Sequence, residues 1–451
     1  MDKKKDSFGS KVGFVMAAAG SAVGLGNIWR FPYLAAKYGG GIFLLVYIIL
    51  AITFGYSLMI TEIAIGRKNS KSVIGAYKAV DKRFGFMGPI AAAVPFIITP
   101  YYCVIGGWVL KYFTVFAAGQ VAEATDDAYF GNFISSSKGA TIFFIIFVAL
   151  TAGVVIFGVQ KGIEKISKLL MPVLIVLTIA IAIYSMTIPG AMEGVKYYLL
   201  PNLDGFTFTD LLKTIVAAMG QLFYSMSLAM GIMVTYGSYM RKEDAIEPCV
   251  RQIEIFDTGV ALLAGLIIVP AVFAFSGGNA AALNAGPSLM FVTLPKVFDF
   301  MPFGRVVGIA FFVLVALAAW TSSISLLETI VSIVMEKFNM KRIGATIVCV
   351  AIVFVLGMTS VLGYSDWSNV TIFGYQFLDF YDFISNNIIM PIVELLTCIL
   401  IGYFAKTAYV EQEVLHGESS FKARKLYKAM ILVVCPVCMI IILLTPFITS
   451  L

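Results

Sequence analysis

Charged residues are scarce in this chain, and histidine is nearly absent. Asp, Glu, Lys and Arg make up 13% of its 451 residues, against roughly 25% in ordinary soluble proteins. The single histidine, His416, falls in a polar stretch, so no buried histidine serves a hydrolytic triad, a proton relay or a metal cluster. The chain also has no Walker-type phosphate loop. These absences argue against an enzyme and against ATP-driven transport.

Disulfide bonds and a cleavable leader are not expected either. The six cysteines fall in or beside apolar stretches and give no disulfide framework. We interpret the pair Cys435 and Cys438 (CPVC) as packing inside a hydrophobic span. The first apolar run is too long for a signal peptide and carries an unusual polar motif.

Long apolar runs are what the chain has in abundance, since 60% of its residues are hydrophobic. A helix needs about 20 mainly apolar residues to cross a bilayer. The pattern therefore predicts an all-α membrane protein with eleven spans, near 11–36, 41–66, 87–116, 141–158, 166–188, 210–240, 252–275, 304–335, 344–362, 377–405 and 428–449. The stretch 280–300 is too polar to span and is expected to form a re-entrant or capping loop.

The basic residues indicate how the chain lies in the membrane. Lys and Arg gather in the N-terminal segment, in the loop 67–86 and in the later loops of that same side, as they do in cytoplasmic loops. The opposite loops are poor in basic residues. We therefore expect an inner (plasma) membrane protein with a cytoplasmic N-terminus and, because eleven is odd, an extracellular C-terminus. The net charge of +6 then reflects topology, and no nucleic-acid partner is expected.

The first apolar stretch contains a motif that a simple membrane helix should not have. From Gly20 to Pro32 it reads GSAVGLGNIWRFP, with three glycines in seven residues. Each glycine weakens a helix by about 1 kcal/mol relative to alanine, and Arg30 adds an ionisable group at depth. Unwound backbone is tolerated at membrane depth only where protein buries it or it lines a wet cavity. The motif predicts a broken helix whose free carbonyls and amides hold a ligand.

A second interruption follows about 200 residues later. From Gly220 to Gly231 the chain reads GQLFYSMSLAMG, in the middle of the sixth predicted span. Interrupted helices at matching positions of two halves indicate a transporter binding site. We expect one transmembrane domain, 1–451, made of two inverted five-helix repeats at about 10–188 and 209–405, with broken helices 1 and 6 and an extra helix at 428–449.

These motifs, together with Ala318–Ser323 (AAWTSS) in the eighth span, resemble the neurotransmitter:sodium symporter family, and especially its eleven-span bacterial amino-acid transporters. The resemblance runs essentially from end to end. It implies two Na⁺ sites as the cofactors. The first would use the Ala22 carbonyl with Asn27, Ser225 and Asp257. The second would use the carbonyls of Gly20, Val23 and Ala318 with Thr321 and Ser322.

The resemblance also implies where a small amino acid binds. Its carboxylate would meet amides of the first broken helix and the Tyr102 hydroxyl, and its amino group would meet carbonyls near Ala22 and in the second break. The implied substrate-binding residues are Ser21, Ala22, Val23, Leu25, Gly26, Ile98, Tyr102, Tyr224, Ser225, Ser227, Ala229, Met230, Ser322 and Leu326. This lining favours a neutral hydrophobic amino acid. Where monoamine transporters of the family carry an aspartate, this chain has Gly24, which argues against an amine without a carboxylate.

Gates follow from the same resemblance. Arg30 and Asp382 would form the outer pair. On the cytoplasmic side Lys5 and Phe8 stand where the family usually has arginine and tryptophan, facing Tyr239 and Glu336. Buried Glu62 is expected to accept hydrogen bonds from the backbone of the broken helices.

The function predicted is sodium-coupled import of a neutral hydrophobic L-amino acid by alternating access. Because Asp257 supplies a negative charge near the first sodium site, chloride should be unnecessary, and proton antiport is expected. Three alternatives remain open: a channel-like pore, a non-transporting amino-acid sensor in the membrane, and a proton-coupled transporter of the same fold.

Overall fold

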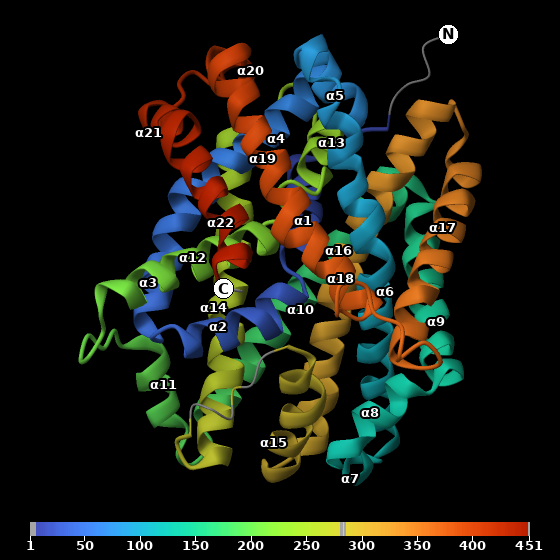
Figure 1. The fold of residues 1–451 in the computed structure, drawn as a ribbon, viewed down its shortest axis with the longest axis vertical. Coiled ribbons are helices and arrows are strands. Elements are labelled where there is room, and N and C mark those ends of the chain that lie inside the picture. The colour runs from blue at the N-terminus through green and yellow to red at the C-terminus, as the bar shows by residue number, and fades with distance from the viewer. Residues whose placement is uncertain (1–5, 280–282, 284–285, 450–451) are drawn as a thin grey trace.

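The computed structural model describes residues 6–279, 283 and 286–449. Apart from two isolated bridges, at Gly40–Pro201 and Ile372–Tyr375, the regular structure of the described residues is helical. The expected all-α class is thereby confirmed. The helices run mostly along one direction and form a bundle with short helices at both ends (Figure 1).

Nine helical segments of the described chain are long and apolar enough to cross a membrane. They are α3 (Gly41–Leu50) with η2 (Ala51–Gly55) and α4 (Tyr56–Asn69); η3 (Lys82–Phe84) with α6 (Met87–Ala118); α9 (Ser137–Val155); η4 (Val159–Glu164) with α10 (Lys165–Met186); α14 (Ile246–Ser276); α16 (Gly304–Phe338); α17 (Arg342–Tyr364); α18 (Phe377–Phe383) with η7 (Ile384–Ile389), α19 (Met390–Ile399) and η8 (Leu400–Phe404); and α21 (Arg424–Ala429) with η10 (Met430–Val434) and α22 (Cys435–Thr449).

Two further predicted spans are each interrupted in the described chain. The first consists of α1 (Lys11–Ala22) and, after a bend of 52°, η1 (Gly26–Arg30) with α2 (Phe31–Lys37). The second consists of α12 (Phe208–Ser225) and α13 (Ile232–Tyr239), separated by six residues. Neither α12 nor α13 is long and apolar enough to cross by itself, so their union as the eleventh span stays a prediction.

Short helices cover the two ends of the bundle. They are α5 (Val73–Val80), α20 (Ala408–Val414) and η9 (Leu415–Gly417), and also α7 (Val121–Ala124), α8 (Asp127–Ser135), α11 (Ala191–Leu199), η6 (Leu289–Thr293) and α15 (Leu294–Phe300). Figure 1 shows α5 and α20 at one end and α7, α8 and α15 at the other. Within the stretch expected to cap the bundle, the described residues include η6 and α15, and α15 packs against α16.

The two split helices lie among the longest continuous ones. α1 packs against α10, α14 and α16, and α13 packs against α4. Both split helices begin at side-chain caps. Ser10 accepts from Gly13 N at the start of α1, and Thr207 with Asp210 forms a capping box at the start of α12. Such caps satisfy backbone N–H groups that have no partner within the helix, and thereby fix where each half-helix starts.

Glycines bring α4 and α13 into direct backbone contact. A Cβ built on Gly66 would lie 1.9 Å from the Val234 carbonyl oxygen, and one on Gly237 would lie 2.4 Å from the Ile63 oxygen. Small residues permit such close approach of membrane helices. The contact holds α13, one half of the second split helix, firmly against α4.

We expect Gly66→Ala to destabilise the protein, because its Cβ would clash with the Val234 carbonyl oxygen. That oxygen belongs to the backbone of α13 and cannot move away by a side-chain rotation. Overpacking costs about 1–3 kcal/mol, and a backbone clash lies at the upper end of that range. Thermal unfolding of the purified protein in detergent measures this. Gly153→Ala is the matched control, since no atom lies within 4 Å of the position of its Cβ; equal melting temperatures for the two variants would contradict the role of this contact.

Candidate functional site

The first helix breaks where the sequence places its glycines. Val23 ends α1 with extended ψ of 96°. The backbone N–H groups that follow find side-chain acceptors instead of helical carbonyls: Gly24 N donates to Asn27 Oδ1 at 3.0 Å, and Leu25 N donates to Tyr102 Oη at 3.2 Å. The unwound backbone is thus held by a side chain of η1 and a tyrosine of α6.

The second break turns through unusual backbone conformations. Ser227, Ala229 and Gly231 all have positive φ, at 55°, 57° and 71°, a region that residues other than glycine rarely adopt. Glu62 of α4 is fully buried, and its Oε1 accepts a hydrogen bond from Ala229 N at 2.6 Å. The expectation that Glu62 supports the freed backbone is confirmed at this break.

The proposed ligands of the first sodium site meet around Asp257. Its Oδ1 accepts from Asn27 Nδ2 at 2.7 Å and from Ser225 Oγ at 2.8 Å, and Tyr47 Oη donates to its Oδ2 at 3.4 Å. Asp257 is fully buried on α14, so it does not cap a helix at the surface. One helix from each split span therefore converges on a single buried carboxylate.

The proposed ligands of the second site also lie together. Ser322 Oγ lies 3.4 Å from the carbonyl oxygens of both Gly20 and Val23, and 3.0 Å from that of Ser21. One residue earlier, Thr321 Oγ1 lies 3.1 Å from the Ala318 oxygen, and the Thr321 Cβ would lie 3.2 Å from a Cβ on Gly20. Uncharged oxygens from the end of α1 and from α16 thus form one cluster, of the kind that hard cations prefer.

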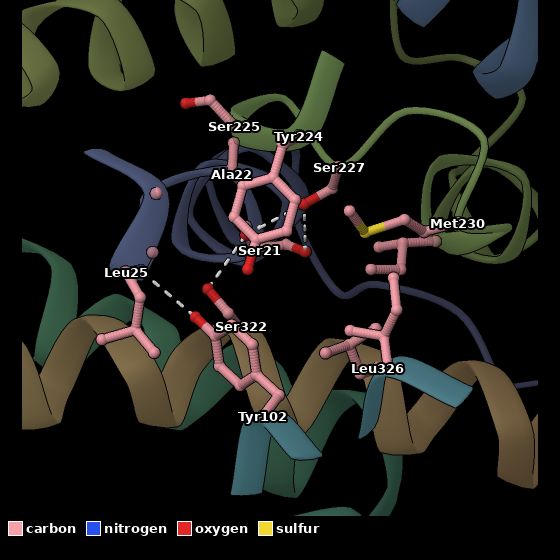
Figure 2. A pocket seen from close by; sticks show the side chains of 14 residues that line it. Ser21, Ala22, Leu25, Tyr102, Tyr224, Ser225, Ser227, Met230, Ser322 and Leu326 are labelled. Atoms are coloured by element: carbon pink, nitrogen blue, oxygen red, sulfur yellow. Dashed lines mark hydrogen bonds between the residues drawn. The ribbon is translucent and has the colours of Figure 1, made fainter. Parts of the chain in front are cut away.

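A cavity lies between the two breaks. It contains about 330 Å³ of space between atoms, a volume that includes space open to solvent. Figure 2 shows the hydroxyls of Tyr102, Ser227 and Ser322 gathered around Ser21 and Leu25, with Met230 and Leu326 on the other side. Its lining consists of Ser21, Ala22, Gly24, Leu25, Gly26, Ile98, Tyr102, Tyr224, Ser225, Ser227, Met230, Ile232, Ser322 and Leu326. The cavity is polar at one end and apolar at the other.

Two expected lining residues lie elsewhere, and two lining residues were missed. Val23 and Ala229 are not among the residues that line the cavity. Ala229 N donates to Glu62 on the far side of the turn after Ser227. Gly24 and Ile232 line the cavity instead. A Cβ on Gly24 would lie 2.8 Å from both Ser322 Oγ and Tyr102 Oη, so the cavity leaves no space there for an acidic side chain.

The outer gate differs from the expected ion pair. The Arg30 guanidinium lies 5.5 Å from the centre of the Tyr224 ring, a cation–π distance. Asp382 accepts instead from Tyr101 Oη at 3.1 Å and Asn386 Nδ2 at 2.6 Å. Within the described part of the chain, Arg30 and Asp382 form no ion pair within 4 Å.

The network around Tyr239, expected on the cytoplasmic side, uses a different acid from the one predicted. Tyr239 Oη donates to Glu328 Oε1 at 2.8 Å, and Arg342 binds both oxygens of Glu328, at 3.0 and 2.6 Å. Arg342 also reaches Asp6 at 2.8 Å. Glu336, two helical turns beyond Glu328, accepts from Ser72 N and does not face Tyr239. Sequence spacing therefore misplaced this partner.

The N-terminal segment is held to this network by its own residues. Phe8 N donates to the Tyr239 carbonyl at 3.0 Å, and the Phe8 ring packs edge-on against Phe14, Tyr236 and Tyr239. Lys5, the expected gate residue, lies outside the described residues. An arginine guanidinium can bind both oxygens of a carboxylate at once, which a lysine ammonium does not do. In this network Arg342 of α17 makes that two-point contact, with Glu328.

We expect Arg342→Ala to release this segment. Its removal leaves Glu328, which is fully buried, without a cationic partner, and an unpaired buried charge costs about 3–5 kcal/mol. Hydrogen–deuterium exchange of residues 6–14 should become faster. Glu336→Ala, which changes an exposed acid outside the network, is the control; a slow exchange in both variants would show that Arg342 does not hold the segment.

Comparisons with known proteins agree with one another. The model of the sodium:neurotransmitter symporter family matches residues 5–126 and 132–450. An uncharacterized sodium-dependent transporter, YhdH of Bacillus subtilis, is 38% identical over 427 residues, covering 94% of this chain and 93% of that protein. Another uncharacterized sodium-dependent transporter, from Haemophilus influenzae, is 34% identical and covers 90% of each chain. The crystal structure of MhsT in complex with L-phenylalanine superposes with a TM-score of 0.87 at 35% identity, over 98% of this chain and 99% of that one.

Proposed function

The chain belongs to the sodium:neurotransmitter symporter family, and from this premise we propose that it imports a neutral, hydrophobic L-amino acid in symport with sodium. The family resemblance read from the sequence is thus confirmed. Members of this family are sodium-dependent membrane transporters and not enzymes. The observation that carries the substrate proposal is the cavity between the two helix breaks, polar at one end and apolar at the other.

The polar groups of the cavity support a substrate that carries both an α-carboxylate and an α-ammonium group. The Tyr102 hydroxyl accepts from Leu25 N at 3.2 Å and keeps its own proton to donate to a carboxylate. Carbonyl oxygens near Ala22 and in the turn around Ser227 offer acceptors for an ammonium group. With glycine at position 24 there is no counter-charge for an amine that lacks a carboxylate. The L-phenylalanine bound to MhsT has the same pattern of charges.

The apolar end supports a hydrophobic side chain. Met230 and Leu326 lie at this end (Figure 2), and Ile98 and Ile232 also line the cavity. The flexible thioether of methionine lets such a pocket adapt to shape. A charged substrate side chain would lose its hydration there without gaining a partner. We therefore propose leucine-like and aromatic amino acids as substrates.

We propose two sodium sites at the two oxygen clusters. The first combines the Ala22 carbonyl, Asn27 and Ser225 with the negative charge of Asp257. The second combines carbonyls of Gly20, Val23 and Ala318 with the hydroxyls of Thr321 and Ser322. Each cluster joins α1 to a different helix, α14 or α16, so bound sodium would favour one arrangement of α1. This links ion binding to the alternation of the gates.

Alternating access would then follow from the two breaks and the two gates. The N-terminus is proposed to be cytoplasmic and the C-terminus extracellular, with inverted repeats at about 10–188 and 209–405. The Asp6–Arg342–Glu328–Tyr239 network closes the cytoplasmic side with ion pairs, whereas Arg30 over Tyr224 closes the outer side with a weaker contact. Opening inward therefore requires more contacts to break than opening outward.

Uptake of radiolabelled leucine into proteoliposomes tests this function. We expect concentrative uptake that requires an inward sodium gradient, with competition by hydrophobic amino acids and little competition by lysine or glutamate. Unchanged uptake without sodium would favour a proton-coupled transporter, and leucine binding without uptake would favour a sensor. A flux that fails to saturate would favour a pore.

Two variants make this test specific to the ion sites. Asn27→Ala and Thr321→Ala should each abolish uptake while leaving expression intact. Thr178→Ala is the control, because Thr178 also bonds a carbonyl of its own helix, at 2.7 Å, but lies outside both clusters. Loss of uptake in all three variants would point to general damage and not to sodium sites.

The charge of Asp257 gives a separate prediction on chloride. With a fixed carboxylate beside the first sodium, wild-type uptake should be the same when gluconate replaces chloride. Asp257→Ser removes that charge, so its uptake should depend on chloride. In the return of the empty carrier an unpaired buried carboxylate is costly, and we expect it to carry a proton outward. Wild-type uptake that stops without chloride, or a serine variant that ignores chloride, would contradict this role.

A further inference from the structure

A second hollow lies apart from the substrate cavity and shares no lining residue with it. It contains about 1170 Å³ of empty space, part of it open to the surroundings of the protein. The span formed by α3, η2 and α4 makes one wall, α14 makes another, and α21 closes one end. The lining consists of Ile48, Ala51, Ile52, Tyr56, Arg251, Glu254, Ile255, Thr258, Gly259, Leu262, Ala423 and Leu426. Ile52 and Ile255 are 57% and 70% exposed, so this groove faces the membrane.

Three polar atoms in the groove have no partner. Tyr56 Oη, Glu254 Oε1 and Thr258 Oγ1 are buried and make no hydrogen bond within the described part of the chain. Tyr56 and Glu254 are only 3% and 6% exposed. Leaving such a group unpaired costs about 1–3 kcal/mol. Three of them in one apolar groove point to a bound molecule that supplies their partners.

The polar end of the groove carries positive charge. Arg251 lines it with a half-exposed side chain that donates to Glu247 at 2.6 Å and lies 5.7 Å from the Tyr56 ring. Lys422 and Lys425 are exposed, and each directly precedes a lining residue, Ala423 and Leu426 respectively. In the proposed orientation this end lies at the cytoplasmic leaflet, where basic pockets between helices bind lipid headgroups.

We propose that this groove holds one phospholipid whose headgroup combines a phosphate with a hydrogen-bond donor. An acyl chain lies along Ile48, Ile52 and Leu262. Arg251 binds the phosphate, and the lipid's ester oxygens accept from the hydroxyls of Tyr56 and Thr258. The donor of the headgroup, an ammonium or a hydroxyl, reaches Glu254. These contacts satisfy all three unpartnered atoms at once.

The position of the groove connects the lipid to transport. Glu254 and Thr258 lie within one helical turn of Asp257 on α14, and Asp257 belongs to the proposed first sodium site. A lipid bound to Glu254 and Thr258 supports α14 from the membrane side. This consequence for transport rests on the proposed function, whereas lipid binding itself does not.

Native mass spectrometry of the purified full-length protein tests the proposal without any transport. The protein is exchanged into detergent with phosphatidylethanolamine, phosphatidylglycerol or phosphatidylcholine of the same acyl chains. We expect one tightly retained lipid, with about a tenfold or greater preference for a donor headgroup over phosphatidylcholine, as expected for a charge-assisted hydrogen bond. Comparison of the first two lipids tells an ammonium donor from a hydroxyl donor.

Two variants and a matched control locate the lipid. No atom lies within 4 Å of a Cβ built on Gly259 or on Gly153, so both accept a larger side chain. Gly259→Leu should fill the groove and release the lipid, and Gly153→Leu, outside the groove on α9, should retain it. Glu254→Met should still bind lipid but lose the headgroup preference. No retained lipid, equal retention of phosphatidylcholine by the wild type, or full retention by Gly259→Leu would overturn the proposal.

Discussion

Backbone polar groups at membrane depth need partners from the protein itself, and the whole site depends on how this chain provides them. After the end of α1, Gly24 N donates a hydrogen bond to Asn27 Oδ1, and Leu25 N donates one to the Tyr102 hydroxyl. After the end of α12, the Glu62 carboxylate accepts a hydrogen bond from Ala229 N. Because these side chains take up the amides, carbonyl oxygens of the first break remain directed at Ser322. Oxygens inside an apolar bundle need hydrogen-bond donors or cations as partners. The proposed sodium sites therefore lie at the same breaks that create the cavity.

Asp257 joins several parts of this arrangement. Asn27 belongs to the first broken helix, Ser225 ends α12, and Tyr47 comes from α3, yet all three donate to one carboxylate on α14. In its proposed role the same carboxylate supplies the negative charge of the first sodium site. A single buried charge then connects ion binding to the positions of both broken helices. The membrane-facing groove contacts the same stretch of α14, so the lipid surroundings act on the helix that carries this charge.

The sequence indicated the broken helices well, because glycine, proline and polar residues are rare enough in apolar spans to mark them. Asn27, Ser225, Thr321 and Ser322 were indicated by the resemblance to the family, because polar residues inside a span more often form hydrogen bonds between helices than bind ions. The sequence did not indicate the conformation of the turn after Ser227. Ser227 and Ala229 adopt positive φ, and Ala229 N donates to Glu62 of a distant helix, a tertiary contact that local sequence does not show. Glu328 and Glu336 lie two turns apart on α16, and only the position of Arg342 on α17 decides which acid meets Tyr239.

The central claim is that two sodium ions and one amino acid bind together at the two breaks. Equilibrium binding of radiolabelled leucine to the purified protein, measured as a function of sodium concentration in detergent, tests it directly. Because binding coupling is reciprocal, leucine affinity should rise steeply with sodium, with a Hill slope approaching two that falls in Asn27→Ala. Leucine affinity that does not change between sodium and choline buffers would contradict the account.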